Sequence, residues 1–210
     1  MILEFIYQIM NYLLVIIDKL GYMGIFIGMT IESSFFPFPS EVILFPAGAL
    51  IANGEMLFLP VFIASLLGVI AGATINFFIA FFIGRTTVDF LISKYGKLIF
   101  ITNKKLEKID NYFKKHGEIT TFVGRFLPGI RQLISLPAGF SKMNYFKFAI
   151  FTALGAGIWN LILIYVGYFF GNNPTWINEN IGILISLVLI FSLLIIAIYT
   201  IYKKEKSTQH

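Results

Sequence analysis

Residues 32–41 read Glu-Ser-Ser-Phe-Phe-Pro-Phe-Pro-Ser-Glu, and they interrupt a segment that is otherwise as apolar as a membrane span. Proline cannot donate the helical hydrogen bond, and it pushes the residue before it away from helical geometry. Pro37 and Pro39 therefore predict a break in the helix at this point. We expect two short helices, at about 21–33 and 41–52, that form a hairpin with the proline segment at its tip.

A second interrupted segment is predicted at about residues 118–140. It contains Gly-Arg-Phe-Leu-Pro-Gly-Ile-Arg at residues 124–131, and it ends in Pro-Ala-Gly, as the first segment does. The first tip is acidic and the second is basic. The residues expected to shape the two hairpins are all proline or glycine: Pro37, Pro39, Pro46, Gly48, Pro128, Gly129, Pro137 and Gly139.

The composition is that of an integral membrane protein. Of the 210 residues, 58% are hydrophobic and 13% are charged, whereas soluble domains have roughly 45–50% apolar and about 25% charged residues. The length predicts one membrane domain over residues 1–210 with no attached soluble domain. The absence of cysteine excludes disulfides.

Three segments are apolar and long enough to cross a bilayer as helices, at 58–84, 146–170 and 181–202. Residues 2–17 carry a polar stripe and fall short of a full span. We expect them to form an amphipathic helix in the membrane interface, and a tilted spanning helix is the alternative. The polar segment 85–118 is predicted to hold amphipathic helix on one membrane surface.

The order of these elements occurs twice. An amphipathic segment, a proline-broken hairpin and a spanning helix make up residues 1–84, and the same order returns in 85–172. One span separates the two units, so we expect inverted topology with one re-entrant hairpin entering from each membrane face. Transporters built from inverted repeats place their sites where broken helices meet. The predicted fold is all-α: this inverted repeat followed by a C-terminal transmembrane helix.

Orientation follows from the basic residues. Segments 85–118, 141–147 and the tail 203–210 together hold 13 of the 16 Lys and Arg, whereas 53–57 and 172–180 hold none. Cytoplasmic loops of membrane proteins carry the excess of Lys and Arg. We therefore expect a cytoplasmic C-terminus, with the acidic hairpin opening outward and the basic hairpin opening inward. The side of the N-terminus stays open.

Four charged residues lie around the two hairpin tips, and they are Glu32, Glu41, Arg125 and Arg131. A charge at bilayer depth costs about 3 kcal/mol, so four of them predict a role. One reading is structural, with Glu–Arg bridges that only hold the hairpins together. The other is a transport site. Arginine forks onto phosphate with two parallel hydrogen bonds, and a buried carboxylate near an arginine can exchange protons in a useful pH range.

Other candidates are weaker. Asn76 and Asn160 lie inside spans, and we expect each to make an interhelical hydrogen bond. No spacing of His, Asp and Glu predicts a metal site, and no nucleophile elbow or glycine-rich phosphate loop is present. We therefore expect neither an enzyme nor a cofactor. The net charge of +5 follows from the loops, so no nucleic-acid partner is expected.

Over about residues 20–172 the sequence resembles the DedA family of membrane proteins, also called the SNARE-associated or VTT-domain family. The motifs that carry the resemblance are Gly21-Tyr-Met-Gly-Ile-Phe, Glu32 with Pro37-Phe-Pro39-Ser-Glu41, Lys115-His-Gly117, Phe122-Val-Gly-Arg125-Phe-Leu-Pro128-Gly-Ile-Arg131, Pro137-Ala-Gly139 and Gly155-Ala-Gly-Ile-Trp159-Asn. Some members have a Pro-Gly-Asp turn where this chain has Pro39-Ser-Glu41, which indicates a Pro-x-Pro-Ser-Glu subgroup.

The resemblance implies a bacterial cytoplasmic-membrane protein with two opposed re-entrant hairpins. It also implies lipid translocation, chiefly the return of undecaprenyl phosphate to the inner leaflet, with dependence on the proton gradient and a part in envelope integrity. The acidic pair and the arginine pair that the family needs correspond here to Glu32, Glu41, Arg125 and Arg131. In this hypothesis Arg125 and Arg131 bind the phosphate headgroup, while Glu32 and Glu41 couple transport to protons.

Three alternatives remain at this point. The chain could be a scramblase for ordinary phospholipids such as phosphatidylethanolamine, which should be indifferent to the proton gradient. It could carry a small soluble anion, which would need a closed cavity without lateral access. It could also be an assembly factor whose buried charges are structural. In that last case, changing both partners of a Glu–Arg pair to neutral residues should restore function.

Overall fold

The computed structural model describes residues 19–34, 39–95, 103–127 and 130–170, and in these residues the chain is helical without a strand. The helices are α2 (Tyr22–Ser33), α3 (Glu41–Ala52), α4 (Phe58–Tyr95), α5 (Asn103–Gly124), α6 (Ile130–Leu133), α7 (Ser135–Phe140) and α8 (Tyr145–Phe170). The short helices expected at 21–33 and 41–52 are α2 and α3. The helix expected at 2–17 and the last span at 181–202 lie outside the described residues.

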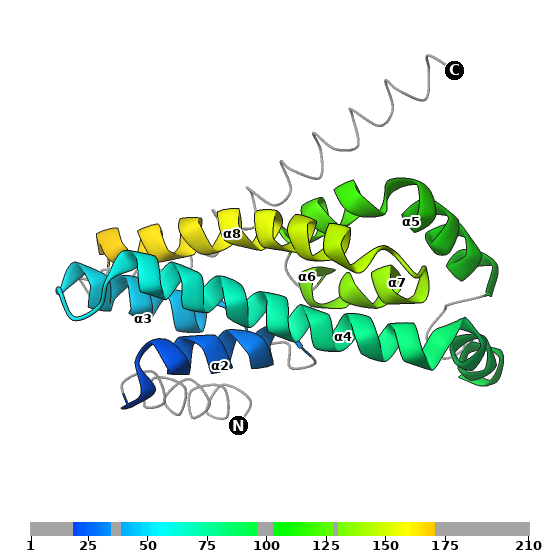
Figure 1. Ribbon diagram of the computed structural model, residues 1–210, viewed down its shortest axis with the longest axis horizontal. Helices are drawn as coiled ribbons and strands as arrows, with labels where there is room; N and C mark the ends of the chain where they lie inside the picture. Colours follow the sequence, from blue (N-terminus) through cyan, green and yellow to red (C-terminus); the bar gives the residue numbers. More distant parts are fainter. Residues whose placement is uncertain (1–18, 35–38, 96–102, 128–129, 171–210) are drawn as a thin grey trace, which may run out of the picture.

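Two long helices form the axis of the molecule. α4 and α8 run side by side along its length, with α2 and α3 towards one end and α5, α6 and α7 towards the other (Figure 1). Their apolar parts, Phe58–Gly84 and Tyr145–Phe169, have 27 and 25 residues, and about 20 residues suffice to cross a bilayer. Gly84 has a φ of 70° and bends α4 at the end of the expected span, a conformation that glycine adopts without steric cost.

The short helices lie in two hairpins of the chain. α2 begins beside the start of α4, where the N–H of Leu57 donates to the Oη of Tyr22 at 3.0 Å. α3 then leads the chain back to the start of α4. In the second half, α5 bends at His116 and α6 and α7 lead back to the level of that bend. There the hydroxyl of Thr121 contacts the Sδ of Met143 at 3.8 Å.

Glycines allow the short helices to approach the long ones closely. A Cβ on Gly48 of α3 would lie 2.4 Å from the carbonyl oxygen of Ile164 in α8. A Cβ on Gly139 of α7 would lie 2.3 Å from the carbonyl oxygen of Phe77 in α4. α2 packs on α4 at Gly68 in the same way. Small residues are what membrane helices use at such contacts.

The residues expected to shape the hairpins take different places. Pro46 lies inside α3 and Pro137 lies inside α7, so neither ends its helix, and Gly48 and Gly139 are packing contacts. Pro39 stands in the short connection before α3. The three remaining residues of this group lie outside the described residues: Pro37, Pro128 and Gly129.

Two apolar cores fill the space between the helices, one towards each end of the molecule. The first, around Met29, Leu44 and Trp159, fills the space between α2, α3, α4 and α8. The second, around Phe77 and Phe148, fills the space between α4, α5, α7 and α8. The polar residues described next lie between these two cores.

Candidate functional site

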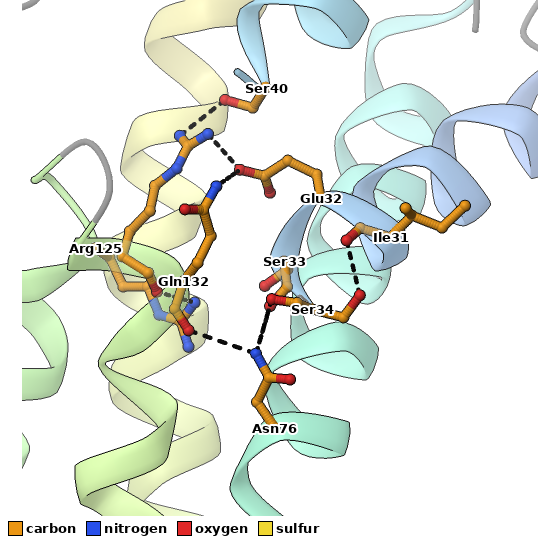
Figure 2. A network of polar contacts seen from close by, with 9 residues as sticks. Ile31, Glu32, Ser33, Ser34, Ser40, Asn76, Arg125 and Gln132 are labelled. Carbon is orange, nitrogen blue, oxygen red and sulfur yellow. Dashed lines mark hydrogen bonds and ion pairs between the residues drawn. The ribbon is translucent and has the colours of Figure 1, made fainter. Parts of the chain in front are cut away.

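Glu32 and Arg131 form an ion pair between the two hairpins. Glu32 is near the end of α2 and is 3% exposed, and Arg131 is on α6 and is 9% exposed. The Nε2 of Gln132 also donates to Glu32 Oε1, at 3.3 Å, and the Nη1 of Arg131 donates to Ser40 Oγ at 2.8 Å. Figure 2 shows Ser40, Glu32 and Gln132 converging from three helical segments. The end of α2, the residue before α3 and the helix α6 therefore meet in the interior.

Arg125 lies beside this pair and has a different set of partners. Its Nη1 donates to the backbone carbonyl of Arg131 at 3.0 Å, and its Nη2 donates to the hydroxyls of Ser135 and Thr152 at 3.1 and 3.2 Å. These acceptors are all neutral, and within the described part of the chain Arg125 makes no ion pair. Its Nε is buried without a hydrogen-bond partner there. Arg125 is thus a buried cation, 3% exposed, without a bound carboxylate.

The guanidinium groups of Arg125 and Arg131 each pack against an aromatic ring of one apolar core. Arg131 Cζ lies 6.0 Å from the centre of the Trp159 ring, and Arg125 Cζ lies 6.0 Å from the centre of the Phe148 ring. Both distances are within the range in which a cation is attracted to an aromatic face. Each arginine is therefore packed against the core of a different end of the molecule.

Asn76 of α4 holds the ends of both hairpins. Its Nδ2 donates to the carbonyls of Ser33 at 3.3 Å, Ser34 at 2.9 Å and Gln132 at 3.5 Å, and Figure 2 shows it below these residues. Asn160 of α8 donates to Ser65 Oγ at 3.1 Å. The interhelical hydrogen bonds expected of both asparagines are confirmed.

A small cavity of about 10 Å³ lies next to the arginines, which is about the space that one water molecule needs. It is bounded by side chains of α2, α4, α6 and α8 and by Arg125, and the polar ones are Glu32, Ser33, Arg125, Arg131, Gln132, Trp159 and Asn160. The Oγ of Ser33 and the Nε1 of Trp159 are buried without partners among the described residues. Two arginines against one carboxylate give this cavity a positive balance, which suits an anion.

Glu41 is not part of this cluster. It is the first residue of α3 and is half-buried, and it makes no ion pair or side-chain hydrogen bond with the described residues. A carboxylate in the first turn is favourable because the N-terminus of a helix carries partial positive charge. The structure therefore brings together Glu32, Arg125 and Arg131, and it leaves Glu41 at the edge of the site, where its charge still repels that of Glu32.

Several polar residues of the site were not singled out from the sequence. Those that bind the three buried charges through side chains are Ser40, Gln132, Ser135 and Thr152. The available signal was their polarity within apolar segments. That signal was weak, because a single hydroxyl in a membrane helix can bond to its own backbone, as Thr30 does to Phe26 at 2.8 Å.

Comparison with known proteins places this chain among membrane proteins of bacteria. The model of the VTT domain matches residues 38–169. The chain is 32% identical to undecaprenyl phosphate transporter A of Bacillus subtilis, over 90% of this chain and 91% of that protein. It is also 32% identical to an alkaline phosphatase-like protein of Lactococcus lactis, over 97% of this chain and 96% of that one.

A further relative is protein DedA of Escherichia coli, 32% identical over 74% of this chain and 69% of that protein. No solved structure matches the chain. The domain match begins after α2 and therefore leaves out Glu32, but it covers α3 to α8 almost completely and includes both arginines of the buried cluster. The chain therefore belongs to the VTT-domain family of membrane proteins, the DedA family.

Proposed function

We propose that this protein is a flippase that returns undecaprenyl phosphate from the outer to the inner leaflet of the bacterial cytoplasmic membrane, driven by the proton gradient. The observation that carries the proposal is the buried cluster of Arg125, Arg131 and Glu32. It holds two arginines against one carboxylate, at the point where the two hairpins meet. Relatives named undecaprenyl phosphate transporter A, in Bacillus subtilis and in Staphylococcus aureus, supply the substrate of the proposal.

The membrane arrangement is also part of the proposal. α2 and α3 have 12 residues each, which gives about 18 Å of helix, well short of the roughly 30 Å hydrocarbon core. We infer that both hairpins are re-entrant and that they enter from opposite faces. Non-helical backbone is tolerated at membrane depth when protein covers it, and α2 and α7 pack against α4 while α3 packs against α8.

Matched packing supports an inverted repeat. Gly48 meets α8 at Ile164 O and Tyr168 N, and Gly139 meets α4 at Phe77 O and Phe81 N, four residues further along in each case. Each hairpin therefore lays its Pro-Ala-Gly against the spanning helix of the other unit. We infer from this exchange that the two hairpins contribute to one shared site, as in transporters with inverted repeats.

In the proposed mechanism, the phosphate competes with Glu32 for Arg131. An arriving phosphate offers Arg131 and Arg125 charged acceptors, and arginine binds such oxygens through two parallel hydrogen bonds. Protonation of Glu32 weakens its hold on Arg131, because a neutral carboxyl no longer balances a cation. Proton arrival at Glu32, with Glu41 at the edge of the site, thereby frees the arginine for the headgroup. The isoprenyl tail stays in the lipid throughout.

The name of the Lactococcus relative suggests a second function, that of a phosphatase. We propose a transporter instead. Among the described residues that line the cavity there is no histidine, and the carboxylate there is held by an arginine. The hydroxyl of Ser33 therefore has no base beside it of the kind that nucleophilic catalysis needs. We expect no release of inorganic phosphate from undecaprenyl phosphate.

The test uses the purified full-length chain in liposomes with undecaprenyl phosphate in the outer leaflet. We expect its loss from that leaflet to be faster with an imposed pH gradient, to be absent in Arg131→Ala, and to exceed that of phosphatidylethanolamine. Loss of both lipids at equal rates without a gradient would replace the proposal with a scramblase. Release of inorganic phosphate would replace it with a phosphatase.

A further inference from the structure

A second cavity lies at the other end of the second hairpin, away from the arginines. It has a volume of about 420 Å³, within the range of small-molecule sites. It lies between α5 at its bend, the loop after α7 and the first turn of α8. Its polar lining includes Lys114, Lys115, His116, Glu118, Lys142 and Lys147. We call it the lysine cleft.

The charge of the lysine cleft is strongly positive. It contains four lysines and one glutamate. Lys147 Nζ and Glu118 Oε1 pair at 2.5 Å, which leaves three cations over. Within the described part of the chain, Lys114, Lys115 and Lys142 make no ion pair. These three lysines, which have no counter-charge among the described residues, give the cavity the electrostatic character of an anion site.

The backbone adds to this charge. α8 begins at the cleft, and Asn144 caps it, since its Oδ1 accepts from the N–H of Lys147 at 3.2 Å. The start of a long helix presents free N–H groups and partial positive charge to an anion. His116 stands at the bend of α5, and its Nδ1 is buried without a partner among the described residues. The cleft thus has both charge and directed donors.

Lys142 occupies an unusual backbone position. Its φ is 53°, in the left-handed region, where glycine is the common residue. It ends α7 in a Schellman motif, in which the N–H of Lys142 donates to Gly139 O at 3.0 Å and that of Met143 donates to Ala138 O at 3.1 Å. A lysine at this position is less favourable for the backbone than glycine. The side chain of Lys142 lines the cleft.

The cleft lies at the boundary of an apolar span. The span of α8 begins at Tyr145, directly after the loop that lines the cleft. Phe146 is 75% exposed there, and it stands next to Lys147, so an exposed apolar ring adjoins a cation at the start of the span. A headgroup in the cleft would therefore keep its apolar tail beside Phe146.

We propose that the lysine cleft binds the phosphate group of an anionic ligand, and its position at the span boundary favours a lipid headgroup over a soluble phosphate. The site is separate from the arginine cluster, and the proposal does not require transport. It gives a role to the Lys115-His-Gly117 motif, which the transport site does not use. A Cβ on Gly117 would lie 3.2 Å from Met143 Sδ, so the side chain of Met143 would have to shift to admit a larger residue at this bend.

The test places the full-length protein in phosphatidylcholine nanodiscs containing phosphatidate, and native mass spectrometry measures the phosphatidate that it retains. The cleft variant is Lys114→Gln/Lys115→Gln/Lys142→Gln. The matched control is Lys203→Gln/Lys204→Gln/Lys206→Gln, which removes the same charge from the tail. A surface lysine adds about 1 kcal/mol to binding of anionic lipid, so the cleft variant should bind phosphatidate about a hundredfold more weakly. The control should match the wild type.

Three further arms make the result specific. Lys142→Gly should weaken binding while its melting temperature stays equal or rises, which separates binding from folding. The cleft variant is also assayed for transport of undecaprenyl phosphate, which should stay at the wild-type rate, so that this proposal and the transport proposal fail separately. Titration calorimetry with glycerol 3-phosphate tests whether the ligand is a soluble phosphate and not a lipid headgroup. If it binds the wild type and not the cleft variant, while phosphatidate retention is unchanged, the ligand is a soluble phosphate. Equal weakening of phosphatidate retention in both triple variants would overturn the proposal. Unchanged retention in both would also overturn it if glycerol 3-phosphate binds the cleft variant as tightly as the wild type.

Discussion

Arg125 donates a hydrogen bond to the backbone carbonyl of Arg131 at 3.0 Å, so the guanidinium of one arginine holds the main chain that carries the other. The two arginines are therefore not equivalent. Arg131 faces Glu32 and Ser40, whereas Arg125 binds neutral acceptors on three segments. A change at Arg125 is expected to disturb the position of Arg131, and a change at Arg131 is expected to leave Glu32 without its counter-charge.

The first prediction concerns the stability of the Glu32–Arg131 pair. Glu32→Gln and Arg131→Gln should each lower stability by about 3 kcal/mol, because removing one partner leaves a buried charge unbalanced. The double variant Glu32→Gln/Arg131→Gln should recover most of that loss, since both charges are gone. Thermal unfolding in detergent measures all three. A double variant that loses the sum of the two single losses would show that the residues do not act as a pair.

The exposed pair Lys147–Glu118 is the control for this comparison. Its side chains are 61% and 43% exposed, and exposed pairs contribute roughly 0.2–1 kcal/mol. Glu118→Gln should therefore change the melting temperature far less than Glu32→Gln does. A loss of similar size at both sites would remove burial as the reason for the cost at Glu32.

The second prediction concerns the shape of the Arg125 side chain. Arg125→Lys keeps the charge and loses the planar fork that reaches Arg131 O, Ser135 and Thr152 together. At least one charged hydrogen bond should be lost, at a cost of about 2 kcal/mol. Transport of undecaprenyl phosphate should fall because the main chain at Arg131 is no longer fixed. Full transport by Arg125→Lys in folded protein would show that charge alone suffices there.

The sequence predicts the helices of the hairpins well and the contacts of the site only in part. Prolines act on local backbone geometry, so Pro37 and Pro39 suffice to separate two helices at the observed bounds. Which arginine meets Glu32 depends on the rotation of α6 against α2, and no local signal sets that rotation. For the same reason Glu41 was grouped with Glu32, although it lies at the edge of the site. Ser40 and Gln132 acquire their roles only through the fold.

The third prediction concerns the two Pro-Ala-Gly contacts. Gly48→Ala and Gly139→Ala should each destabilise the protein by about 1–3 kcal/mol, because the added methyl meets a helix backbone that cannot move aside. Gly157→Ala is the control, since its Cβ would find ordinary contacts at 3.7 Å and beyond. It should be neutral or slightly stabilising. A large loss at one of the first two positions alone would contradict the equivalence of the two hairpins.

The fourth prediction concerns Asn76. Asn76→Leu removes the donor shared by the carbonyls of Ser33, Ser34 and Gln132, and it should lower stability by about 1–3 kcal/mol. Asn160→Leu removes a single bond to Ser65, and it should cost less. Unfolding in detergent compares the two. An equal or larger loss at Asn160 would show that Asn76 does not hold the hairpin ends together.

The central claim is that the buried charges perform transport and do not only hold the fold together. The most direct measurement is the gradient-driven loss of undecaprenyl phosphate from the outer leaflet of liposomes that contain the double variant Glu32→Gln/Arg131→Gln, shown to be folded. The account predicts that this variant has lost transport, because it can neither bind a proton at position 32 nor hold a phosphate at position 131. Transport restored to the wild-type rate would contradict the claim and would make the pair a structural bridge.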